Sequence, residues 1–142
     1  MKINLTNSWS LTVLPHRLWR SLTAGCNDLT CAADLPAPAA PATVEGAVTV
    51  PATVPGNFEL DLFRAGLIPD PFFGTNIIDL RKLEDRHLFY VTTFDAPPDG
   101  TDGLVLHFEG IDTVAKVYVN GEQAAACDNM FIPWDVPLRN LR

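Results

Sequence analysis

The stretch from Leu104 to Gly121 constrains the fold more than any other part of this sequence. Its first half alternates apolar and polar side chains, and a period of two predicts a β-strand with one apolar face. Its second half, Val114 to Val119, is rich in valine, which suits a half-buried pleated surface. Asn120-Gly121 then supplies the two positive φ angles of a type I′ hairpin turn, so a further strand should fold back from Glu122.

Similar short elements are expected elsewhere along the chain. We expect strands over Leu5 to Leu14, Val48 to Val54, His87 to Phe94 and Phe131 to Val136, and helical turns over His16 to Leu22, Phe58 to Ala65 and Ile77 to Leu83. Pro51 limits its strand to a sheet edge. Asn57 is a good N-cap and Gly66 a good C-terminal stop for the helix between them. Leu60 and Phe63 should pack inward, with Leu62 as a further candidate.

Several short strands joined by turns, with only single-turn helices, predict an all-β fold, an antiparallel β-sandwich. The length of 142 residues is that of one domain, so we expect residues 1–142 to form a single domain with a variable Pro/Ala-rich loop at about 25–46. We count about six strands where a complete sandwich has seven to nine, so the domain should be partial at its C-terminus. An open sheet edge could then support a homo-oligomer.

Charge and composition exclude several classes of function. The net charge of −7 argues against a nucleic-acid partner and an anionic membrane surface, since both need clustered Lys and Arg. The N-terminus shows neither a signal peptide nor a membrane span, which favours a cytoplasmic location. Three cysteines and three scattered histidines lack the spacing of a metal site, and no phosphate-binding glycine loop occurs, so we expect neither a metal nor another cofactor.

Two segments are candidate sites for binding a sugar. Sugar sites combine aromatic faces with carboxylate or amide groups that hold hydroxyls. The loop from Asp70 to Asn76 supplies both kinds of group, and Asp128-Asn129 comes just before a second aromatic. The candidate substrate-binding residues are therefore Asp70, Phe72, Phe73, Asn76, Asp128 and Asn129. A structural loop that plugs the sandwich edge, or ordinary turn chemistry, would explain the same residues.

No catalytic residue is expected in this chain. Glu109 and Asp112 flank Gly110 and could be taken for a pair of catalytic carboxylates, but a strand end and a turn explain them better. No serine has the sequence context of a nucleophile elbow.

Six motifs, in order, resemble those of a known family. They are Ala52–Gly56, Asp61–Asn76, Leu83–Arg86, Phe108–Ala115, Val117–Gly121 and Asp128–Phe131. The set resembles the N-terminal domain of the β-mannosidases of glycoside hydrolase family 2, from about Val48 to the end of the chain.

The resemblance implies a galactose-binding-like jelly roll that packs against a catalytic TIM barrel of the parent chain. That barrel would carry both catalytic glutamates, which lie roughly 5–5.5 Å apart in a retaining enzyme. This chain would then be an accessory domain that shapes the site for terminal β-mannosides and is inactive alone. Two alternatives stay open: a free-standing carbohydrate-binding module, and a structural interaction domain with a protein partner.

Overall fold

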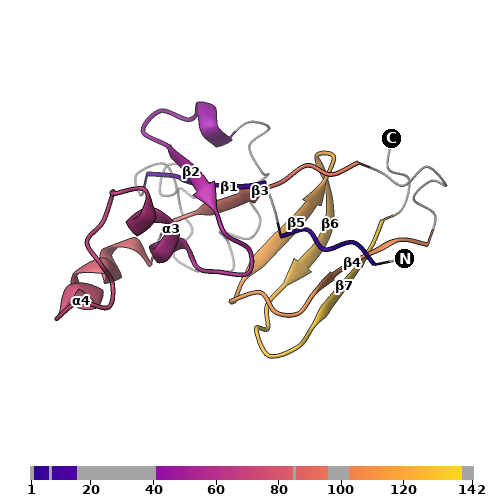
Figure 1. The fold of residues 1–142 in the computed structure, drawn as a ribbon. Helices are drawn as coiled ribbons and strands as arrows, with labels where there is room; N and C mark the ends of the chain where they lie inside the picture. Colours follow the sequence, from indigo (N-terminus) through magenta and orange to yellow (C-terminus); the bar gives the residue numbers. More distant parts are fainter. Residues whose placement is uncertain (1, 7, 16–40, 85, 96–102, 139–142) are drawn as a thin grey trace, which may run out of the picture. The chain divides into compact units, whose positions relative to one another are not determined.

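The computed structural model describes residues 2–6, 8–15, 41–84, 86–95 and 103–138 (Figure 1). The predicted helical turn from His16 to Leu22, Cys26, Cys31 and most of the Pro/Ala-rich loop lie outside the described residues. The described residues up to 94 form one compact unit and those from 95 onward form a second, and each is described by itself. That residues 1–142 make one domain stays a prediction.

The first unit is built on a three-stranded antiparallel sheet. Strand β1 (Trp9–Val13) lies between β2 (Val48–Ala52) and β3 (Leu88–Val91), as Figure 1 shows. In the register, Leu11 of β1 stands opposite Val50 of β2 and Tyr90 of β3. The three predicted strands are confirmed, although each is shorter than its apolar pattern, and β2 is an edge strand of this sheet, as its proline predicts.

Short helices complete the first unit. They are η1 (Pro41–Thr43), α3 (Phe58–Arg64), α4 (Asn76–Leu80) and η2 (Arg81–Leu83), of which η1 and η2 are 3-10 turns. Asn57 caps α3 as predicted, because its side chain accepts a hydrogen bond from the Leu60 N–H at 2.9 Å, and Gly66 follows with a φ of +72°. The buried core of the unit consists of Leu11, Val13, Val50, Leu62, Leu80 and Leu83.

The second unit holds two antiparallel strand pairs. Strand β4 (Val105–Phe108) pairs with β7 (Trp134–Pro137), and β5 (Ala115–Val119) pairs with β6 (Glu122–Cys127). The β5–β6 turn has φ angles of 50° at Asn120 and 85° at Gly121, which confirms the predicted type I′ geometry. The described residues thus hold seven strands, one more than expected, and every pairing among them is antiparallel. The all-β prediction is confirmed; association through an open edge stays a prediction.

In the part of the chain that the structure describes, no helix has both the length and the apolar character needed to span a bilayer.

Candidate functional site

The loop between α3 and α4 is organised around Asp70. The Asp70 carboxylate accepts a hydrogen bond from the Phe72 N–H at 2.9 Å. This is an Asx turn, in which an aspartate side chain bonds the backbone N–H two residues later. The Asp70 carbonyl accepts two more, from the Phe73 N–H at 3.2 Å and from the Asn76 side-chain amide at 2.9 Å. The structure therefore brings together four of the six predicted site residues in a single turn.

The two aromatic side chains of this loop face solvent. Phe72 is 81% exposed and Phe73 is 73% exposed, whereas Pro71 between Asp70 and Phe72 is buried. The proline anchors the loop while the hydrogen bonds of Asp70 hold its backbone. Because large apolar side chains are seldom this exposed on a fixed backbone without a partner, these rings are candidates for a contact surface.

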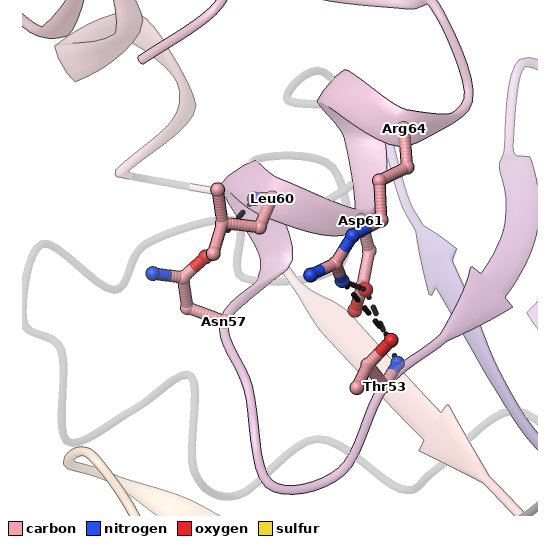
Figure 2. A network of polar contacts seen from close by, with 5 residues as sticks. All are labelled: Thr53, Asn57, Leu60, Asp61 and Arg64. Atoms are coloured by element: carbon pink, nitrogen blue, oxygen red, sulfur yellow. Dashed lines mark hydrogen bonds and ion pairs between the residues drawn. The ribbon is translucent and has the colours of Figure 1, made fainter. Parts of the chain in front are cut away.

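A buried carboxylate fixes α3, the helix that precedes this loop. Figure 2 shows Asp61 Oδ1 accepting two hydrogen bonds, one from the Thr53 N–H and one from Arg64 Nη1, both at 3.1 Å. Arg64 Nη1 also donates to Thr53 Oγ1 at 3.0 Å, which closes a three-residue network. Asp61 is only 2% exposed. The network ties α3 to the residue that follows β2, and it sets the direction in which the chain enters the loop.

The sequence analysis missed this role of Asp61. Phe63, which was predicted to pack inward, is 39% exposed, whereas Leu62, a further candidate for the inward face, is in the core. The Asp61 carboxylate, which accepts a hydrogen bond from the Thr53 N–H, faces inward in place of the aromatic ring. The local signal in the sequence was the spacing of Asp61 three residues before Arg64. Acid–arginine pairs with this spacing are common on helix surfaces, so the spacing does not identify a buried ion pair.

The other two predicted residues belong to the second unit, in the turn between β6 and β7. Asn129 accepts a hydrogen bond from the Phe131 N–H at 2.9 Å through its side chain, and from Trp134 Nε1 at 3.0 Å through its carbonyl. Phe131, which the sequence analysis did not select, is 86% exposed. Asp128 is exposed and follows Cys127, and burial together with the Asp128 charge raises the pKa of that thiol. The turn repeats the arrangement around Asp70, with an Asx residue holding an exposed phenylalanine two positions on.

A hollow of about 190 Å³ lies beside α4 in the first unit. It is lined by Glu59, Ile77, Ile78, Leu80, Arg81 and Glu84. Arg81 and Glu84 form an ion pair at 3.3 Å across one turn. The lining therefore combines three apolar and three charged side chains.

The described residues contain no cluster of three or more His, Cys, Asp or Glu side chains that could hold a metal ion. Glu109 and Asp112 are both exposed. The candidate site is thus a displayed surface of aromatic and aliphatic side chains on a braced turn.

Comparison with known proteins adds a family to this geometry. The glycosyl hydrolase 2 galactose-binding domain-like family matches residues 38–142. A probable beta-mannosidase of Caenorhabditis elegans is 36% identical over 90 residues, which are 63% of this chain and 10% of that protein. Beta-mannosidase B of Thermothelomyces thermophilus is 40% identical over 89 residues, which are 61% of this chain and 10% of that protein.

A solved structure is similar to nearly the whole chain. The crystal structure of a beta-D-mannosidase from Dictyoglomus thermophilum superposes with a TM-score of 0.66 and 27% identity. The match covers 96% of this chain and 13% of that protein. The chain therefore spans about a tenth of the length of the curated relatives that it matches.

Proposed function

Since the chain belongs to the glycosyl hydrolase 2 galactose-binding domain-like family, we propose that it is the N-terminal accessory domain of a β-mannosidase-like glycoside hydrolase. Two findings support the fold class, an all-β, galactose-binding-like sandwich. They are the match to this family and the similarity to the solved β-D-mannosidase structure. The observation that carries the proposal is that the compared relatives are a probable β-mannosidase and a β-mannosidase B, and that the matched part is about a tenth of the length of each.

In this proposal the chain contributes shape and contacts, and a separate catalytic domain contributes the chemistry. Three carboxylates of the described residues are already engaged in pairs with cations or with histidine. These pairs are Asp61–Arg64, Glu84–Arg81 and Asp135–His107. A retaining glycosidase needs two carboxylates roughly 5–5.5 Å apart that flank the scissile bond, and the catalytic domain would supply them.

The first experiment measures nitrophenol release from a nitrophenyl β-mannoside by the purified chain. The proposal predicts no release above the buffer rate at any chain concentration. Release that scales with the concentration of the chain, and that persists through purification, would contradict the assignment of catalysis to another domain.

The exposure of Phe72 and Phe73 favours a second candidate function, a carbohydrate-binding module. Aromatic faces stack on the apolar C–H faces of sugars, and Asp70 and Asn76 belong to the same hydrogen-bonded turn as both phenylalanines. Titration calorimetry with mannose distinguishes the two functions. A module predicts a dissociation constant of about 1 mM or tighter that Phe72→Ala abolishes, whereas the accessory domain alone predicts no saturable heat.

A further inference from the structure

The turn between β5 and β6 carries a pair of residues that can react with each other. Asn120 is the only asparagine in the sequence that is followed by a glycine. An asparagine side chain is labile because the backbone nitrogen of the next residue can attack it, and a side chain on that next residue obstructs the attack. Glycine has no Cβ, so the obstruction is least at Gly121.

The turn leaves the attacking nitrogen open to solvent. Asn120 and Gly121 are both exposed. Among the described residues, no backbone carbonyl accepts a hydrogen bond from the Gly121 N–H. Apart from the two chain neighbours of Gly121, none of these residues places an atom within 4 Å of the point where a Cβ would stand. Water and hydroxide can therefore reach the groups that react.

A bulge separates the end of this hairpin from the rest of its ladder. The register shifts between Val117 and Tyr118, so among the described residues only two pairs, Val119 with Glu122 and Tyr118 with Gln123, lie between the bulge and the turn. We call these the tip pairs. Glu122 and Gln123 are exposed. Two pairs with so little burial open at a low cost in free energy, and opening allows the rotation that ring closure needs.

We propose that Asn120 deamidates spontaneously in the folded chain, and that its isoaspartate product breaks the tip pairs while the bulge confines the damage. In the first step a base removes the proton of Gly121 N, which attacks Asn120 Cγ. A bond forms between these two atoms, the Cγ–Nδ2 bond breaks, and the departing nitrogen takes up a proton and leaves as ammonia. The product is a five-membered succinimide ring.

Water then opens the succinimide at one of its two carbonyl carbons. Cleavage of the bond from Gly121 N to Cγ gives an aspartate, and Asp-Gly suits a type I′ turn as Asn-Gly does. Cleavage of the bond from Gly121 N to the backbone carbonyl carbon gives isoaspartate instead, whose main chain runs through Cβ and Cγ and is one atom longer. Because the geometry of a two-residue turn sets the register of its hairpin, the longer turn cannot keep the tip pairs.

Three other asparagines of the described residues serve as internal controls. Asn57, Asn76 and Asn129 each use the side chain in a hydrogen bond to the backbone. Each also precedes a residue with a large side chain. Both features oppose the same reaction at these positions.

The first measurement follows deamidation of the purified chain at mildly alkaline pH by mass spectrometry. Trypsin releases residues 117–139 as one peptide that contains both Asn120 and Asn129, so fragment masses compare the two sites in the same molecule. We expect Asn120 to react at least tenfold faster than Asn129, and its rate in native buffer to lie within tenfold of its rate in concentrated urea. Equal rates at the two sites, or a native rate more than tenfold below the rate in urea, would overturn the proposal.

The second measurement locates the structural effect of the product. Anion exchange isolates the deamidated fraction, because it carries one more negative charge. The matched control is the Asn120→Asp variant, which has the same charge without the longer main chain. Amide NMR spectra of the fraction should contain one set of peaks that coincides with the variant and a second set, from isoaspartate, in which the tip pairs have lost their strand-like shifts.

In that second set, the peaks of Ala115 and Cys127, a pair on the far side of the bulge, should stay in place. A fraction whose peaks all coincide with those of the variant would show that isoaspartate does not form or does not disturb the turn. Displaced peaks at Ala115 and Cys127 would show that the bulge does not confine the change. Either result would contradict the proposal.

Discussion

Asp61 is the side chain on which the placement of α3 depends most. A buried carboxylate needs hydrogen bonds to replace its hydration, and here Thr53 and Arg64 provide them to Oδ1, while the buried Oδ2 has no hydrogen-bond partner among the described residues. Asp61→Asn keeps the shape and removes the negative charge, so the ion pair with Arg64 is lost and the Thr53 N–H is left with a neutral acceptor. We expect the free energy of unfolding to fall by roughly 1.5–3 kcal/mol in urea denaturation.

Asp79→Asn is the matched control for that variant, because Asp79 is an exposed acid on the neighbouring helix α4. Its effect should stay within about 0.5 kcal/mol, as is usual for surface substitutions. Equal stabilities for the two variants would show that the Asp61 network does not hold the helix.

Tyr90 on β3 gives the fold a dependence on alkaline pH. Burial, with smaller contributions from the carboxylates of Asp61 and Glu59, raises the pKa of Tyr90 to about 12 from an ordinary value of 10.0. The folded state therefore holds this proton more tightly than the unfolded chain does. The stability that this provides is complete below pH 10 and is lost as the pH rises from 10 towards 12.

Tyr90→Phe removes the titrating hydroxyl. The free energy of unfolding of this variant should therefore fall less steeply than that of the wild type between pH 10 and pH 12. Tyr118→Phe, on β5 of the second unit, is the control for loss of a tyrosine hydroxyl at another position. Denaturation midpoints at pH 9, 10, 11 and 12 measure the difference. Parallel curves for the wild type and Tyr90→Phe would refute the assignment.

At the scale of residues, the sequence predicted local chemistry better than it predicted burial. Asp70 and Asn76 were selected because carboxylate and amide groups can hold sugar hydroxyls, and the structure shows both in hydrogen bonds within one turn. The inward position of Asp61 was missed because its main partner, Thr53, lies eight residues away and outside the helix. A pattern of apolar spacing within one helix contains no information on such a partner.

At the scale of elements, α3 depends on its N-terminal cap. Asn57→Ala removes the acceptor of the Leu60 N–H, and we expect a loss of about 1 kcal/mol in the free energy of unfolding. Asn57→Asp preserves an acceptor and should recover most of that stability. Thermal denaturation followed by circular dichroism makes the comparison, and an alanine variant as stable as the wild type would show that the cap is dispensable.

The strands and the hairpin turn were predictable because their signals are local. Alternation marks a strand, and Asn120-Gly121 marks its turn, so β5 and β6 were placed as a hairpin from the sequence alone. The pairing of β4 with β7 was not predictable, although it joins His107 to Asp135 in register. An apolar period specifies which face of a strand is buried, but not which distant strand lies beside it.

At the scale of the whole molecule, both units display an exposed phenylalanine on a hydrogen-bonded turn. Its seven described strands form two units whose most exposed aromatic residues, Phe72 and Phe131, stand on turns braced in the same way. The repeated arrangement fits a domain that presents fixed contact points to its surroundings. The sequence pointed to this family through six ordered motifs, and the match to residues 38–142 covers all of them.

The most direct measurement uses a chimera in which residues 38–142 of this chain replace the corresponding segment of the Dictyoglomus thermophilum β-D-mannosidase. Its rate of nitrophenyl β-mannoside hydrolysis is compared with that of the same host enzyme from which the segment has been deleted. Our account predicts that removing the segment abolishes activity and that residues 38–142 of this chain restore it well above the level of the deletion. A folded chimera no more active than the deletion would contradict the central claim that this chain is an accessory domain of a β-mannosidase-like enzyme.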